Sequence, residues 1–84
     1  MHIVYSKQAY KYLKKQSEQD YNRILSEINK LPDNHHRIKK LSGISNLYRL
    51  RVGDFRVLFT PELEHGTIKI EKILPRGDVY NGIR

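Results

Sequence analysis

The stretch from residue 47 to residue 59 reads LYRLRVGDFRVLF. Apolar and basic residues alternate on both sides of Gly53-Asp54, and a period of two residues is typical of a strand with one buried face. Two strands joined by a two-residue, glycine-led turn form a β-hairpin, with a turn of type II′ or I′. The stretch therefore predicts an antiparallel hairpin, around which the rest of the fold is arranged.

The turn fixes which residues face one another across this hairpin. On one face the predicted pairs are apolar: Val52 with Phe55, Leu50 with Val57 and Tyr48 with Phe59. The other face carries Arg49, Arg51 and Arg56, with Arg51 directly opposite Arg56. Like charges opposed across a hairpin are unfavourable by roughly 0.2–1 kcal/mol. Either the guanidiniums extend into solvent or meet the acids Glu62, Glu64 or Glu71, or an anion binds between them.

Two further strands are predicted outside the hairpin. Residues 67–74 alternate until Lys72 and then change phase, which indicates a β-bulge. Residues 2–5 are short, apolar and β-branched, as in a strand. Residues 61–66 are polar and begin with proline, and are predicted to form a turn. The result is a four-stranded, mainly antiparallel sheet.

Two helices are predicted between the first strand and the hairpin. Ser6 and Ser17 are N-cap residues, and residues 7–15 carry one apolar stripe. From Tyr21 to Leu31 the apolar residues follow the helical spacing, and Pro32 ends the second helix. A two-residue link makes the pair an antiparallel helical hairpin that packs on one face of the sheet. The fold class is α+β, with an N-terminal strand and a single domain over residues 1–84.

The composition is that of a small basic domain. The chain has 84 residues, a net charge of +7, a pI of about 9.8 and no cysteine. Disulfides and thiolate metal sites are therefore excluded, and the scattered histidines indicate no metal site. No apolar run exceeds three residues, which excludes a transmembrane helix and favours a cytoplasmic protein. No cofactor is expected.

The arginines suggest the kind of ligand. They are concentrated after residue 42, where lysine is scarce. A planar guanidinium suits phosphate oxygens better than an ammonium does. Tyr80, with Arg76 before it, would add a stacking ring and a hydroxyl to the same surface. A polyanion with several phosphates is the ligand that this pattern favours.

Three runs resemble the RelE/ParE superfamily of toxin–antitoxin toxins: LSG at 41–43, the stretch at 47–59, and ILPRGDVY at 73–80. The order of the preceding strand and helices is similar too, so the resemblance covers nearly the whole chain. It implies a RelE/ParE-like fold, similar to that of the microbial ribonucleases. In the ribonuclease branch, it implies a toxin that enters the ribosomal A site and cuts the messenger without metal. In the gyrase-inhibiting branch, the same fold has no nuclease role.

The resemblance also implies roles for individual residues. Arg51, Arg56 and Tyr80 match catalytic positions, and Arg49 and Arg76 match RNA-binding positions. The chain departs from the family in three ways. Arginine stands at 49 and 51 where members often have lysine, only residues 81–84 occupy the place of a C-terminal helix, and the Glu and His that some relatives use as base and acid have no His counterpart near the tail.

The expected function is therefore that of a type II toxin–antitoxin toxin acting as a ribosome-dependent, metal-independent mRNA endoribonuclease. A gyrase inhibitor and an inactive RNA-binding relative are the alternatives. The expected partners are a small acidic antitoxin, the ribosome and mRNA, with no membrane. The free toxin is expected to be a monomer that forms a hetero-oligomer with the antitoxin.

Overall fold

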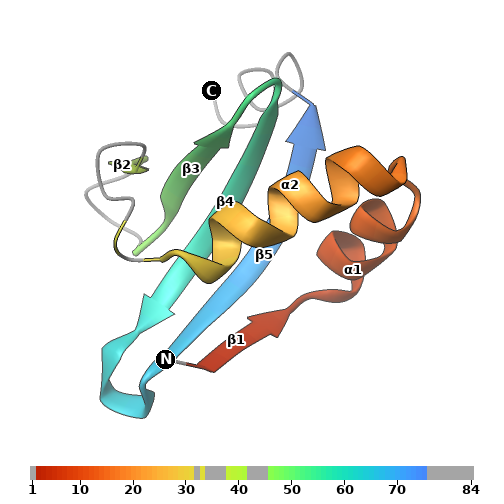
Figure 1. Ribbon diagram of the computed structural model, residues 1–84. Helices are drawn as coiled ribbons and strands as arrows, with labels where there is room; N and C mark the ends of the chain where they lie inside the picture. The colour runs from red at the N-terminus through yellow and green to blue at the C-terminus, as the bar shows by residue number, and fades with distance from the viewer. Residues whose placement is uncertain (1, 32, 34–37, 42–45, 76–84) are drawn as a thin grey trace.

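Five strands form one sheet, and two helices cover one of its faces (Figure 1). The computed structural model describes residues 2–31, 33, 38–41 and 46–75. The strands are β1 (His2–Tyr5), β2 (Ile38–Lys40), β3 (Tyr48–Val52), β4 (Phe55–Glu62) and β5 (Thr67–Pro75), and the helices are α1 (Lys7–Lys14) and α2 (Glu18–Asn29). The sheet order is β1-β5-β4-β3-β2, with β1 parallel to β5 and the other neighbours antiparallel. The predicted α+β class is confirmed.

Both helices begin at the predicted caps. The Ser6 hydroxyl accepts a hydrogen bond from the Ala9 amide at 3.1 Å, and the Ser17 hydroxyl accepts one from the Asp20 amide at 3.2 Å. Their apolar stripes bury against the sheet. The core contains Ala9, Leu13, Ile24, Ile28 and Leu31 from the helical region and Leu50, Val52, Val57, Phe59, Ile68, Ile70 and Ile73 from the strands. Among the described residues, no helix is long and apolar enough to cross a membrane.

The β3–β4 hairpin has the predicted register. Val52 pairs with Phe55, Arg51 with Arg56, Leu50 with Val57 and Tyr48 with Phe59. Gly53 has a φ of +57°, whereas Asp54 has no positive φ. A type I′ turn needs a positive φ at both central residues and a type II′ turn only at the first. The turn is therefore of the II′ kind.

The sheet has one strand more than the sequence predicts. β2 pairs with the free edge of β3, with Ile38 opposite Leu50 and Lys39 opposite Arg49. A three-residue strand with a single apolar side chain is too short to show a periodic pattern in the sequence. It is a strand because its backbone pairs with the edge of β3. β4 also runs on through Pro61 to Glu62, where a turn was predicted. The pairing of β3 with β4 stops at Tyr48 and Phe59. The later residues of β4 therefore form an edge of the sheet, where proline is tolerated.

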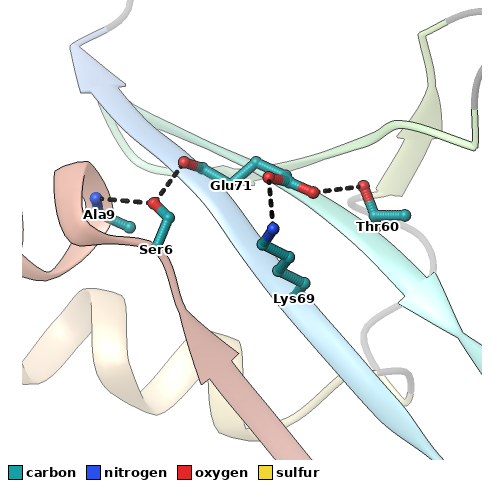
Figure 2. A network of polar contacts seen from close by, with 5 residues as sticks. All are labelled: Ser6, Ala9, Thr60, Lys69 and Glu71. Atoms are coloured by element: carbon teal, nitrogen blue, oxygen red, sulfur yellow. Dashed lines mark hydrogen bonds and ion pairs between the residues drawn. The ribbon is translucent and has the colours of Figure 1, made fainter. Parts of the chain in front are cut away.

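The predicted bulge lies in β5 and leaves Glu71 without an opposite residue, because Lys72 pairs with Leu58 and Ile70 with Phe59. Beyond residue 70, β1 no longer covers this edge of β5, and the start of α1 replaces it. The Ser6 hydroxyl donates to the Glu71 carbonyl at 2.6 Å (Figure 2), and the Gln8 carboxamide exchanges two hydrogen bonds with the Ile73 backbone, at 3.2 and 3.3 Å. The helical layer is thus attached to the bulge.

Tyr5 gives a prediction about stability. Its hydroxyl is buried and has no hydrogen-bond partner in the described part of the chain. Tyr5→Phe removes this unpaired group and is expected to stabilise the fold by about 1 kcal/mol, raising Tm by about 4–8 °C for a chain of this size. Thermal melts at pH 7 measure the change. Tyr10→Phe, at an exposed position, is the matched control and should leave Tm unchanged.

The same variant has a defined pH dependence. Burial raises the pKa of Tyr5 above its ordinary value of 10.0, and Tyr21 adds to the effect. The unfolded chain therefore releases this proton first, so the wild type loses stability as the pH rises through 10 towards the folded pKa. The Phe variant lacks this loss, and its advantage in urea denaturation should widen between pH 9 and pH 11. A constant gap would mean that Tyr5 does not titrate differently in the two states.

Candidate functional site

The face of the sheet that the helices leave uncovered carries the predicted arginines. Tyr48, Leu50 and Val52 of β3 point to the helical side, as their places in or against the core show. Side chains alternate along a strand, so Arg49 and Arg51 lie on the opposite face. Arg56 of β4 joins them because it pairs with Arg51. The structure thus brings together the three arginines of the described part of the predicted site.

Arg51 and Arg56 are opposed in register but differ in environment. Arg51 is exposed, whereas Arg56 is only 3% exposed. The Nη1 of Arg56 donates to the Phe55 carbonyl at 3.0 Å and to the Gly53 carbonyl at 3.3 Å. Arg56 therefore folds back on the hairpin turn instead of extending into solvent or meeting an acid. The two hydrogen bonds to backbone carbonyls partly offset the repulsion from Arg51 on the facing strand.

The Arg56 guanidinium is only partly satisfied by the hairpin. Its Nε is buried and has no hydrogen-bond partner within the described residues. An unpaired buried donor costs free energy. Two backbone carbonyls hold one nitrogen of the guanidinium, and they neutralise none of its positive charge. Arg56 is therefore a fixed cation rather than half of an ion pair.

A second row of cations lies one step further along the same face. Arg49 pairs with Leu58 of β4 on one side and with Lys39 of β2 on the other, and Leu58 pairs in turn with Lys72 of β5. Leu58 is 5% exposed and stands outside the main core cluster. Leu58 is thus a buried apolar residue flanked by Arg49 on β3 and Lys72 on β5. We call Arg49, Arg51, Arg56, Lys39 and Lys72 the basic face.

The acids named as possible partners of the arginines are engaged or placed elsewhere. The Glu71 carboxylate accepts a hydrogen bond from the Thr60 hydroxyl at 3.0 Å and lies 3.8 Å from the Lys69 ammonium (Figure 2). Glu62 and Glu64 line a hollow with Asn46, Pro61 and His65, at the end of β4 away from the turn. Within the described residues, no ion pair joins Arg51 or Arg56 to an acid.

Lys39 and Lys72 are the residues that sequence analysis missed on this face. Lys39 depends on β2, for which the sequence has no periodic signal. The predicted phase change came after Lys72, whereas the bulge makes Glu71 the extra residue and so puts Lys72 on the face of Leu58. A bulge predicted at Glu71 would have put Lys72 opposite Leu58, and so on the basic face. Lys72 is exposed, as is Lys39.

Two predicted site residues, Arg76 and Tyr80, lie outside the described residues. Their roles stay predictions from the resemblance. In the part of the chain that the structure describes, no group of three His, Cys, Asp or Glu side chains could hold a metal ion. The described site therefore consists of cations arranged on a sheet, a chemistry suited to binding an anion and to stabilising negative charge.

Comparisons with known proteins identify relatives over almost the full length. A family model described as "ParE toxin of type II toxin-antitoxin system, parDE" matches residues 3–80. A RelE–RelB complex from Pyrococcus horikoshii OT3 contains a similar chain, at 32% identity and TM-score 0.76, with 90% of this chain and 94% of that chain covered. The comparison with curated proteins finds no match.

Two other solved structures are similar. A RelB–RelE antitoxin–toxin complex from Methanococcus jannaschii contains a chain at 26% identity and TM-score 0.72, with 96% of this chain and 99% of that chain covered. The RelBE2 toxin–antitoxin complex from Mycobacterium tuberculosis contains one at 18% identity and TM-score 0.75, with coverages of 89% and 96%. At 18% identity this last likeness concerns the fold alone.

Proposed function

The chain belongs to the RelE/ParE superfamily of toxins of type II toxin–antitoxin systems, and from that premise we propose that it is a ribosome-dependent mRNA endoribonuclease. The observation that carries the proposal is the basic face. Arg51 and Arg56 are like charges opposed across the hairpin, a pairing that is unfavourable in itself. Neither is paired with an acid within the described residues. Such an arrangement is explained when the ligand supplies the negative charge.

The proposed reaction transfers the RNA phosphate to its own ribose. The 2′-hydroxyl loses its proton to a base and attacks the adjacent phosphorus, and the bond to the 5′-oxygen breaks. That oxygen takes up a proton, so the products are a cyclic phosphate and a free 5′-hydroxyl. Arg51 and Arg56 stabilise the charge that builds on the phosphate oxygens. Arg49 and Arg76 bind neighbouring phosphates, and the ribosome orients the messenger.

Tyr80 is the proposed acid–base residue of this reaction. Its hydroxyl is able to accept the 2′-proton or to hold the attacking oxygen in line. The reaction needs no metal, because guanidinium groups provide the charge stabilisation. The ribosome is the site of action, and we accordingly place the toxin in the cytoplasm.

A second function is supported by a different observation. The family model that matches residues 3–80 is named for ParE toxins, and the gyrase-inhibiting branch to which the resemblance points has no nuclease role. In that case the hairpin arginines would contact a protein and Tyr80 would have no chemical task. A third possibility, an RNA-binding relative without activity, would retain the basic face and lack cleavage.

Two reactions with the purified protein separate these functions. In cell-free translation, primer extension on the messenger should show cleavage that requires ribosomes. In a gyrase supercoiling reaction the same protein should have no effect. Supercoiling inhibition without cleavage would replace the nuclease proposal by the gyrase one, and RNA binding without either activity would indicate an inactive relative.

The proposed partner is an antitoxin, since the structures similar to this chain include RelE–RelB complexes. Arg51, Lys39 and Lys72 of the basic face are exposed, and Val4 and Tyr10 are 40% and 56% exposed. A small acidic protein that wraps the chain would cover both kinds of surface. We propose that the free toxin is a monomer and that it forms a hetero-oligomer with this antitoxin.

Co-expression tests the partner. Induction of the toxin alone is expected to arrest growth, and co-expression of a neighbouring small acidic reading frame should restore it. The two proteins should then purify together. A folded toxin that arrests growth and is neither rescued nor bound by that protein would contradict this choice of partner.

A further inference from the structure

Arg23 of α2 lies against the tip of the β3–β4 hairpin, although it is thirty residues away in sequence. A Cβ built on Gly53 would lie 2.7 Å from Cζ, 2.7 Å from Nη2 and 2.8 Å from Nη1 of Arg23. A point in the plane of a guanidinium, beyond its two terminal nitrogens, is farther from Cζ than from those nitrogens. The near-equal distances therefore mean that the guanidinium presents its flat face to Gly53.

Gly53 is required here for two reasons. Its φ of +57° is one that residues with side chains rarely adopt, and the space beside its Cα is filled by Arg23. On its carbonyl side, Gly53 accepts the hydrogen bond from Arg56. Guanidiniums from α2 and β4 thus contact the same glycine from two directions, and Arg51 stands opposite Arg56. Three arginines converge on this turn.

The stacked guanidinium has its donors available. Arg23 is exposed, and within the described residues no hydrogen bond or ion pair engages it. A guanidinium held by its face keeps its N–H groups around the rim, and those donors match phosphate oxygens in a bidentate geometry. Contact with Gly53 also restricts the side chain before a ligand arrives, which lowers the entropy cost of binding.

The charge around the turn favours an anion. Asp54 is the acid of the turn itself, and it is exposed and forms no ion pair among the described residues. Against this single carboxylate stand Arg23, Arg51 and Arg56. Glu62 ends β4 on the opposite side, and Glu64 follows it two residues later. A polyanion is therefore attracted to the hairpin tip and repelled from the far end.

We propose that Arg23 is a further phosphate-binding residue, which extends the basic face around the hairpin tip to the helical side and holds the RNA backbone beside Arg51 and Arg56. This inference rests on the proposed function, since it names an additional contact to the same RNA. The ligand group is a phosphate of the RNA backbone, because the N–H groups of a guanidinium match phosphate oxygens in a bidentate geometry.

Binding of a single-stranded RNA oligonucleotide across a range of salt concentrations tests the inference without requiring cleavage. Arg23→Ala is expected to weaken binding about tenfold and to reduce the slope of log K against log salt by about 0.7, the value for one phosphate contact in a single strand. Arg23→Lys should recover part of the affinity, because it retains the charge and loses the planar fork. Lys30→Ala, at the C-cap of the same helix two turns away, removes a charge of the same sign, which in the wild type lies 3.0 Å from the Glu27 carboxylate, and should keep the wild-type slope.

Cleavage on ribosomes provides the second readout. Arg23→Ala should raise KM about tenfold and leave kcat within a few-fold, since Arg23 binds a phosphate away from the reacting one. All variants are compared at a temperature at which their melts show them folded. If the wild type binds RNA but cuts nothing, the nuclease proposal fails while the salt slope still decides on Arg23.

Three results would overturn the inference. One is an Arg23→Ala variant with the affinity and salt slope of the wild type. The other is a variant that binds RNA normally but loses affinity for the antitoxin, which would make a carboxylate the partner of Arg23. A slope that falls equally in Lys30→Ala would also contradict it, because the effect would then be one of net charge.

Discussion

Tyr80→Phe is expected to lower the rate of messenger cleavage on programmed ribosomes by about 10²–10⁴-fold, the range for a lost acid–base group. The proposal assigns the chemistry to the hydroxyl, because the ring alone is only able to stack on a base. The variant keeps the ring, so ribosome binding should change little. Single-turnover cleavage, measured by primer extension, separates the chemical step from binding and product release.

Tyr10→Phe is the matched control for this experiment. Tyr10 is exposed on α1, with the Lys14 ammonium 5.7 Å from its ring centre, and loss of its hydroxyl should leave cleavage unchanged. A Tyr80→Phe rate within a few-fold of the wild type would remove Tyr80 from the mechanism. The arginines would then act alone, or, if supercoiling is inhibited, the gyrase function would be the correct one.

The hairpin could be predicted from sequence in detail because two independent signals agree. The alternation on both sides of Gly53-Asp54 defines the faces, and a two-residue turn leaves one register. The helices were equally accessible, since Ser6 and Ser17 stand where caps are needed and the stripe from Tyr21 to Leu31 keeps its period. These features depend on residues close together in the chain.

The parts that sequence analysis missed depend on contacts between distant segments. β2 is a strand only because the edge of β3 offers it hydrogen bonds, and Lys39 reaches the basic face only with it. The helical spacing of apolar residues puts Arg23 on the exposed side of α2. Its contact with Gly53 depends on how α2 packs across the sheet, which the local sequence does not encode. The inward fold of Arg56 is a choice of side-chain direction, which the alternation of a strand does not encode.

Arg56→Ala is expected to reduce cleavage by at least about 10²–10³-fold, the usual loss for a donor that stabilises an oxyanion. It should also lower the free energy of unfolding by about 1–2 kcal/mol, because the Gly53 and Phe55 carbonyls lose their side-chain donor. Tm should then fall by several degrees. Primer extension and thermal melts on the same preparation measure both effects.

Arg51→Ala is the natural comparison, since Arg51 faces Arg56 in register but is exposed. Its loss should reduce cleavage to a similar extent, while stability stays the same or rises by roughly 0.2–1 kcal/mol because one of two opposed charges is gone. The two variants thus separate binding of the phosphate from support of the turn. If Arg51→Ala unfolds the chain as readily as Arg56→Ala, the arginines serve the fold rather than a ligand. If both variants cut messenger at the wild-type rate while folded, the basic face is not the active surface and the nuclease mechanism proposed for it is wrong.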